Sequence, residues 1–184
     1  MISESQHWKD SLRAHADFLH EKRNQTTWRA SSYLRVEQSV MIGCYVVRKL
    51  AESRKIADSR FEMPIVLRSF PATSESIDFL NRHDYFELYD LHKPTQITKP
   101  LSYVVNQIIH SFVFSTVRER PTSGLHGFVF NSDRSKSSQL YLIKRDALTQ
   151  AFASCANSTL SRATVFKLEN GELKYVGEES PQSP

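Results

Sequence analysis

The spacing of hydrophobic residues predicts two helices at the start of the chain. In residues 6–22, Trp8, Leu12 and Leu19 recur at helical intervals among polar residues, which is typical of an amphipathic helix. The next segment, about residues 32–56, has a hydrophobic stripe that widens around most of its middle. A helix of this kind packs against more than one neighbour, so we expect the second helix to be long and central.

A third hydrophobic segment contains two polar residues spaced one helical turn apart. It reads YVVNQIIHSFVF from Tyr103 to Phe114, and it follows Pro100. Proline suits the first turn of a helix, where its missing N–H leaves no hydrogen bond unmade. A helix starting there places Leu101, Val104, Val105, Ile108 and Phe112 on its core side and Tyr103, Asn106 and His110 on the other.

The remainder of the chain has the shorter periods of strands. Residues 61–73 look extended, with Pro64 indicating an edge strand or no strand at all, and residues 74–84 suit a short helix. The aromatic stretch 85–100 looks irregular because it is broken by two prolines. Residues 113–145 read as an antiparallel meander.

A helix at about residues 146–157 and a closing hairpin follow the meander. The pair Asn170-Gly171 between two alternating runs predicts a type I′ turn. Helices come first and strands later, so the sequence predicts an α+β fold with a long central helix, a mostly antiparallel meander and a final hairpin. We expect one domain over residues 1–177 and a flexible polar tail over 178–184.

The positive charge is concentrated in the first third of the chain. The formal net charge is +4, and residues 1–60 contain eleven Lys or Arg against seven Asp or Glu. A basic face attracts phosphate backbones through counterion release. A solvated helix surface would account for the same excess.

The composition also bears on compartment and cofactors. Cys44 and Cys155 have no metal-site spacing, so we expect two free buried thiols in a reducing cytosol. The N-terminal residues lack a secretory pattern, and the longest apolar run, Val40 to Val47, is far shorter than the roughly twenty residues of a membrane span. No nucleotide-binding or metalloenzyme motif is present, so we expect a cytoplasmic protein without cofactor or metal.

Asn106 and His110 are the most specific candidates for chemistry. Residues i and i+4 of a helix lie side by side, and a neutral imidazole can accept and return a proton near neutral pH. The amide could orient the ring or hold a phosphate oxygen, and Tyr103 could add a hydroxyl group or a stacking face. Alternatively, both side chains are enclosed and make hydrogen bonds within the protein.

The segment VNQIIH on an apolar helix, after a long preceding helix, resembles the motif of the HEPN family. These helical domains occur in bacterial defence and toxin systems, and many are metal-independent ribonucleases. The resemblance implies that Asn106 matches the polar position of the motif and His110 its catalytic histidine. Val105 stands where the family has an arginine, so Arg35, Arg118 or Arg120 would have to supply the positive charge from elsewhere.

Two further places are candidate binding elements. Glu37 lies beside the hydrophobic stripe of the second helix, so its carboxylate should have a partner: His110 in an acid–base couple, or an arginine such as Arg35 or Arg48 in a structural ion pair. The stretch RNQTTWR places Arg29 and other polar residues around Trp28. Such a loop can hold phosphates and stack a base, or it can dock the indole as a lid on the core. Residues 131–139 look like a solvated hairpin loop without a function.

Two functions from different classes follow. The first is a binding or assembly module that acts through a macromolecular partner and forms a homodimer through the apolar long helix. The second is a HEPN-like RNA-binding protein or ribonuclease that uses His110, so whether the protein is an enzyme stays open. The first function requires Asn106 and His110 to be enclosed. The second requires them to line an open groove within reach of an arginine.

Overall fold

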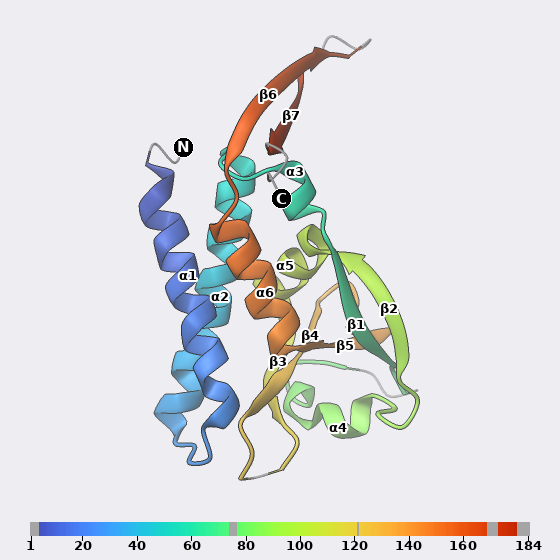
Figure 1. Ribbon diagram of the computed structural model, residues 1–184. Coiled ribbons are helices and arrows are strands. Elements are labelled where there is room, and N and C mark those ends of the chain that lie inside the picture. The colour runs from blue at the N-terminus through green and yellow to red at the C-terminus, as the bar shows by residue number, and fades with distance from the viewer. Residues whose placement is uncertain (1–3, 74–76, 121, 169–172, 180–184) are drawn as a thin grey trace.

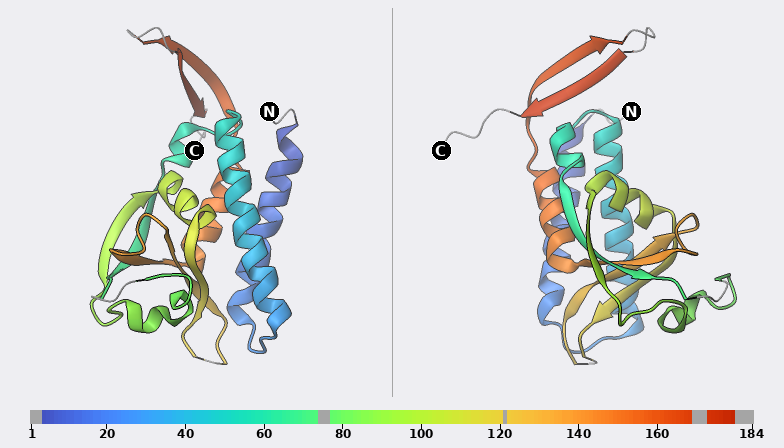
Figure 2. Two further views of the ribbon diagram at one scale, coloured as in Figure 1. Left: turned by 180° about the vertical axis from the view of Figure 1, so that it is seen from behind. Right: turned by 90° about the vertical axis from the view of Figure 1, so that its right-hand side faces the viewer.

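The protein is an α+β structure that begins with helices and continues with strands, as the sequence predicts. The computed structural model describes residues 4–73, 77–120, 122–168 and 173–179. Helix α1 (Ser5–Glu21) leads through a 3-10 turn (Lys22–Asn24) to the long helix α2 (Ala30–Glu52). The two helices lie side by side in Figures 1 and 2, which confirms both predicted N-terminal helices.

A five-stranded antiparallel sheet forms the second layer. Its strands are β1 (Pro64–Pro71), β2 (Thr95–Pro100), β3 (Ser111–Arg118), β4 (Leu125–Ser132) and β5 (Gln139–Lys144), in the spatial order β2-β1-β5-β4-β3. The strands β3, β4 and β5 pair in succession with antiparallel register, so the predicted meander is confirmed.

Two interpretations of the sequence were wrong in this sheet. Strand β1 is internal, because it pairs with both β2 and β5. Pro64 is compatible with that place because it sits at the end of the strand, opposite Pro100. Strand β2 falls in the stretch 85–100, which was predicted to be irregular. The strand can form there because Pro94 precedes it and Pro100 is its last residue, so neither proline interrupts it.

The two faces of the sheet are covered differently. Helices α1, α2, α5 (Leu101–Ile109) and α6 (Arg145–Ala156) share one hydrophobic core with the sheet, which includes Leu12, Val47 and Phe152. Segment 77–89, with its 3-10 turn (Arg82–Asp84) and helix α4 (Tyr85–Leu88), covers a second cluster on the other face. The second face is covered only in part, because Val66 and Arg68 of β1 are exposed. Helix α5 connects β2 to β3 along the chain.

The C-terminal hairpin extends away from this body. Strands β6 (Leu160–Lys167) and β7 (Leu173–Glu179) pair antiparallel, and Figure 1 shows them beyond the short helix α3 (Asp58–Phe61). An ion pair of 2.7 Å between Arg60 and Glu179 ties the hairpin to α3. The hairpin prediction is confirmed, and its expected Asn170-Gly171 turn lies outside the described residues.

Both cysteines are free and buried, as expected. Burial raises the pKa of the Cys44 thiol well above its ordinary value, and burial raises the pKa of Cys155 to about 12. These thiols are therefore protonated and unreactive at neutral pH. Within the described ranges, no helix has both the length and the apolar character needed to cross a membrane.

Candidate functional site

Helix α5 presents a buried face and a polar exposed face. Leu101, Val104, Val105 and Ile108 are buried, whereas Asn106 and His110 are exposed. The helix ends at Ile109, and His110 caps it with its backbone N–H 3.1 Å from the carbonyl oxygen of Asn106. Phe112 is not part of this helix as predicted, because strand β3 begins at Ser111; the side chain joins the second hydrophobic cluster.

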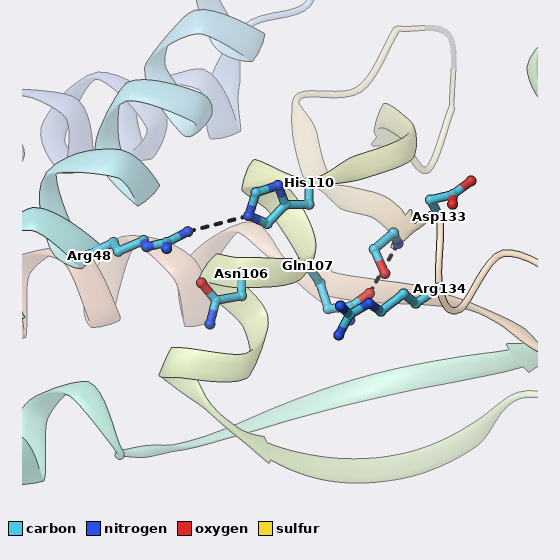
Figure 3. A pocket seen from close by; sticks show the side chains of 7 residues that line it. Arg48, Asn106, Gln107, His110, Asp133 and Arg134 are labelled. Carbon is cyan, nitrogen blue, oxygen red and sulfur yellow. Dashed lines mark hydrogen bonds between the residues drawn. The ribbon is translucent and has the colours of Figure 1, made fainter.

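The exposed face of α5 lines an open cavity of about 530 Å³. Three elements that are distant in sequence contribute to it: the C-terminal part of α2, helix α5, and the turn between β4 and β5. Figure 3 shows Arg48 and Arg134 approaching from opposite sides, with side chains of α5 between them. The lining residues are Arg48, Asn106, Gln107, His110, Ser132, Asp133 and Arg134.

Arg48 contacts the imidazole of His110 directly. Its Nη1 lies 3.3 Å from His110 Nε2, and its Nε donates to Glu52 Oε1 at 2.8 Å. A guanidinium group has only donors, so Nε2 must accept and the ring proton must be on Nδ1. Glu52 holds Arg48 in place from the other side.

Gln107 fixes the turn that carries Arg134. Its Oε1 accepts hydrogen bonds from the Ser132 backbone N–H at 3.0 Å and from Ser135 Oγ at 2.9 Å. Beneath the turn, the Tyr89 hydroxyl donates to the carbonyl oxygen of Lys136 at 2.6 Å. These bonds link α5, the turn and the second hydrophobic cluster, so the cavity wall that contains Arg134 is held in a defined position.

The charges in the cavity favour an anion. The guanidinium groups of Arg48 and Arg134 supply two positive charges to its lining, and Asp133 is the single acidic residue there. Glu52, outside the lining, pairs with both Arg48 and Lys49. Asp133 pairs with Lys136 at 2.7 Å, which offsets its charge. Arginine donors arranged around an open cavity bind phosphate and carboxylate groups.

Tyr103 does not join Asn106 and His110. Its hydroxyl group lies 2.6 Å from that of Tyr141, and the two rings meet edge to face. Burial raises the pKa of Tyr141, and the hydrogen bond with Tyr103 adds to the increase. Tyr103 thus has a place in the packing of α5 against β5 and lies outside the cavity lining.

The expected partner of Glu37 is absent. Glu37 is exposed, and among the described residues no ion pair or hydrogen bond to its carboxylate is found. Arg48 pairs with Glu52 instead, and His110 faces Arg48. Glu37 lines a second open cavity, of about 380 Å³, together with Arg82 and Tyr85.

The remaining predicted residues gather around the N-terminal half of α2. Trp28 and Arg118 do come together, because the Arg118 guanidinium carbon lies 5.5 Å from the centroid of the indole ring. Arg35 stacks instead on Phe18, at 5.2 Å, and Arg29 caps the start of α2. None of these residues lines the cavity beside His110, and neither does Arg120.

Sequence reasoning missed Arg48, Gln107 and Arg134 as site residues. Arg134 belongs to residues 131–139, which were interpreted as a solvated loop without function; Asn131, Ser132 and Ser135 of that stretch are buried. The only usable signal was the high content of serine and asparagine, which favours tight side chain–backbone turns. Nothing local marks Arg48, which lies 62 residues before His110.

The chain matches no protein-family model, no curated protein and no solved structure. The resemblance to the HEPN family therefore stays a prediction. In the part of the chain that the structure describes, no group of three or more His, Cys, Asp or Glu residues is arranged to hold a metal ion. The candidate site consists of arginine, imidazole and amide groups.

Proposed function

We propose that the protein binds single-stranded RNA, with one phosphate group held between Arg48 and Arg134 and against His110. The observation that supports this best is the open cavity in which an exposed His110 lies 3.3 Å from an arginine. An enclosed, fully hydrogen-bonded pair would have favoured a purely structural role. The proposal includes the RNA-binding half of what the resemblance to HEPN domains implies.

The cavity has suitable dimensions and donors for such a ligand. Ligand pockets commonly measure about 300–1,000 Å³, and this one measures about 530 Å³. The planar guanidinium groups can each donate two hydrogen bonds to phosphate oxygens, and the exposed amide of Asn106 can add another.

RNA cleavage is a second candidate function, which the exposed His110 beside Arg48 favours. When Arg48 turns to the phosphate, it leaves His110 Nε2 free to accept the proton of the ribose 2′-hydroxyl group. The 2′-oxygen then bonds to phosphorus as the bond from phosphorus to the 5′-oxygen breaks, and water protonates the leaving oxygen. The products are a 2′,3′-cyclic phosphate and a 5′-hydroxyl end, and no metal takes part.

Fluorescence anisotropy with a labelled 12-nucleotide single-stranded RNA tests the proposal. We expect Arg48→Ala and Arg134→Ala each to weaken binding at least about tenfold, because each removes charged hydrogen bonds worth about 1.5–3 kcal/mol. Arg68→Ala, which removes an exposed arginine from β1, is the matched control. The proposal fails if the wild-type protein does not bind RNA, or if all three variants bind equally well.

A cleavage assay on the same RNA in the presence of EDTA tests the second candidate. We expect His110→Ala to abolish product formation while binding stays within about threefold of wild type. A wild-type protein that leaves the RNA intact would rule cleavage out and leave the binding proposal in place.

The homodimer stays a separate prediction. The outer side of α2 exposes Leu34, Ile42 and Tyr45, with exposed fractions of 55%, 47% and 47%, which a helix pairing with a second copy would bury. Sedimentation velocity of the wild type and of Ile42→Glu tests it. A wild-type dimer that becomes a monomer in the variant supports this interface, and a monomeric wild type contradicts it.

A further inference from the structure

The N-terminal end of α2 has its own cluster of aromatic and cationic side chains. The rings of Trp28 and Tyr33 lie 5.1 Å apart at an angle of 41°. The Arg118 guanidinium carbon, at the end of β3, lies 5.5 Å from the centroid of each ring. Trp28 is half-buried and donates from Nε1 to the carbonyl oxygen of Gln25 at 2.7 Å, so the stack is held in a fixed position.

A basic cavity of about 360 Å³ is lined in part by residues that are close in sequence to this cluster. Its lining includes Glu119, which follows Arg118 in the chain, and the cations Arg23, Lys144 and Arg145. Its two carboxylates have partners, since Glu119 contacts His126 at 3.0 Å and Asp146 contacts Arg145 at 2.6 Å.

Two of the three cations named for this cavity are available to a ligand, because Arg145 pairs with Asp146. Among the described residues, Lys144 and Arg23 have no carboxylate partner; Arg23 has its Nη1 2.9 Å from His20 Nε2. Arg29, which follows Trp28, and Arg120, which is two residues after Arg118, are also exposed.

We propose that this end of the molecule is a second contact surface for the RNA, an inference that rests on the proposed function. A base stacks on the Trp28–Tyr33–Arg118 cluster, and the adjacent phosphates bind Lys144 and Arg23. Proteins that bind single strands combine aromatic rings with a positively charged groove in this way. Stacking on the ring or on the guanidinium plane does not depend on which base is present, so the surface binds single strands without strong sequence preference.

The separation of the two surfaces sets the length of RNA that can reach both. Helix α2 has 23 residues and is therefore about 34 Å long, with Arg48 near one end and Trp28 before the other. A stacked strand rises about 3.4 Å per nucleotide, so 12 nucleotides span about 40 Å and four span only about 14 Å. A 12-nucleotide RNA can occupy both surfaces at once, and the second contact then raises the overall affinity.

Affinity measured against RNA length tests this inference. Anisotropy is recorded with 4- and 12-nucleotide RNAs at two salt concentrations for the wild type, Arg48→Ala, Lys144→Ala, Arg118→Ala and the double variant of the last two. Lys93→Ala is the control, because this lysine lies in the loop before β2 with 79% of its side chain exposed. Urea unfolding checks that each variant folds. If Arg118→Ala is unstable, Lys144→Ala still tests the inference, because Lys144 is exposed.

We expect the double variant to bind the 12-nucleotide RNA about tenfold more weakly than the wild type and to lose most of the gain in affinity from four to 12 nucleotides. Its salt dependence should be shallower by about 0.7 in log–log slope for each phosphate contact removed. Lys93→Ala should behave as the wild type.

Other outcomes overturn distinct parts of the account. If the double variant matches Lys93→Ala while Arg48→Ala binds weakly, the second surface is wrong and the proposed function stands. If the double variant binds weakly while Arg48→Ala binds normally, the cavity between Arg48 and Arg134 does not hold the RNA. The proposed function is then wrong, and so is the claim that one RNA contacts both surfaces. A wild-type protein that binds both lengths equally well also overturns the inference.

Discussion

The two ends of helix α2 hold arginine side chains by different physical means. At the C-terminal end, Arg48 is oriented by polar contacts, with Glu52 at 2.8 Å and His110 at 3.3 Å. At the other end, the Arg118 guanidinium carbon lies 5.5 Å from the ring centroids of both Trp28 and Tyr33. The polar arrangement lies on the surface and contributes little to stability. At the other end Trp28 packs against the hydrophobic core, so this side chain both packs the fold and forms part of the proposed binding surface.

The largest expected effect is on stability, and it comes from removing the Trp28 ring. Trp28 packs against the main hydrophobic core, so Trp28→Ala should lower the free energy of unfolding by about 2 kcal/mol, roughly half the cost of a fully buried tryptophan. His110→Ala should change it by less than about 0.5 kcal/mol, because the ring is exposed. Urea denaturation measures both, and Trp28→Phe, which keeps most of the packing, is the control. Equal losses for Trp28→Ala and His110→Ala would contradict the contrast.

A smaller effect is expected where α5 meets the turn that carries Arg134. Gln107→Leu leaves the Ser132 N–H and the Ser135 hydroxyl without their shared acceptor, which should cost about 1–2 kcal/mol. It should also weaken RNA binding several-fold by releasing Arg134. Asn106→Leu is the control for stability alone, since Asn106 is exposed on the same helix. If Gln107→Leu keeps full stability and affinity, Gln107 does not position the turn.

Glu37 offers a way to sharpen the comparison by affinity alone. This exposed carboxylate lies on α2 between the two ends, where it should repel the phosphates of an RNA that spans both surfaces. Glu37→Gln should therefore raise the affinity for a 12-nucleotide RNA about two- to threefold, measured by anisotropy at low salt. Asp17→Asn, an equal charge change on α1, should leave it unchanged. A lower affinity for Glu37→Gln would mean that the RNA takes another path.

The smallest effect concerns pH and the middle of α2. His15 Nδ1 lies 3.0 Å from Ser39 Oγ, and burial lowers the pKa of His15 below its ordinary value of 6.5. As the pH falls through 6.5, the unfolded chain takes up the proton before the folded protein does, so the fold loses stability; above 6.5 the effect vanishes. Urea midpoints between pH 8 and pH 5 should fall less for His15→Gln than for the wild type. Parallel curves would contradict this assignment.

The sequence predicts the helices well because hydrophobic periodicity follows the packing that stabilises them. Val36, Val40 and Val47 are all fully buried, as the stripe on α2 requires. Strand β2 carried no such signal, because Gln96 and Lys99 face solvent or lie near it at the edge of the sheet. Pro64 indicated an edge strand, but β1 is internal because β2 pairs on its outer side. A rule based on local sequence cannot predict that pairing.

The site could be predicted only as far as a single helix determines it. Asn106 and His110 share a face because of helix geometry alone. Arg48 and Arg134 reach His110 through the way α2 and the β4–β5 turn pack around α5, and several exposed arginines were equally plausible by sequence. The three named as candidates, Arg35, Arg118 and Arg120, lie elsewhere, because tertiary packing decides which of them faces a given cavity.

The most direct test of the central claim is NMR of the histidine side chains during titration with RNA. In the free protein, the ¹⁵N shifts of His110 should show a proton on Nδ1 and none on Nε2. Adding a 12-nucleotide single-stranded RNA should shift the His110 ring signals until they saturate, while exposed His92 in the loop before β2 stays unchanged. RNA that binds the protein without moving the His110 signals would contradict the claim that the cavity between Arg48 and Arg134 holds its phosphate.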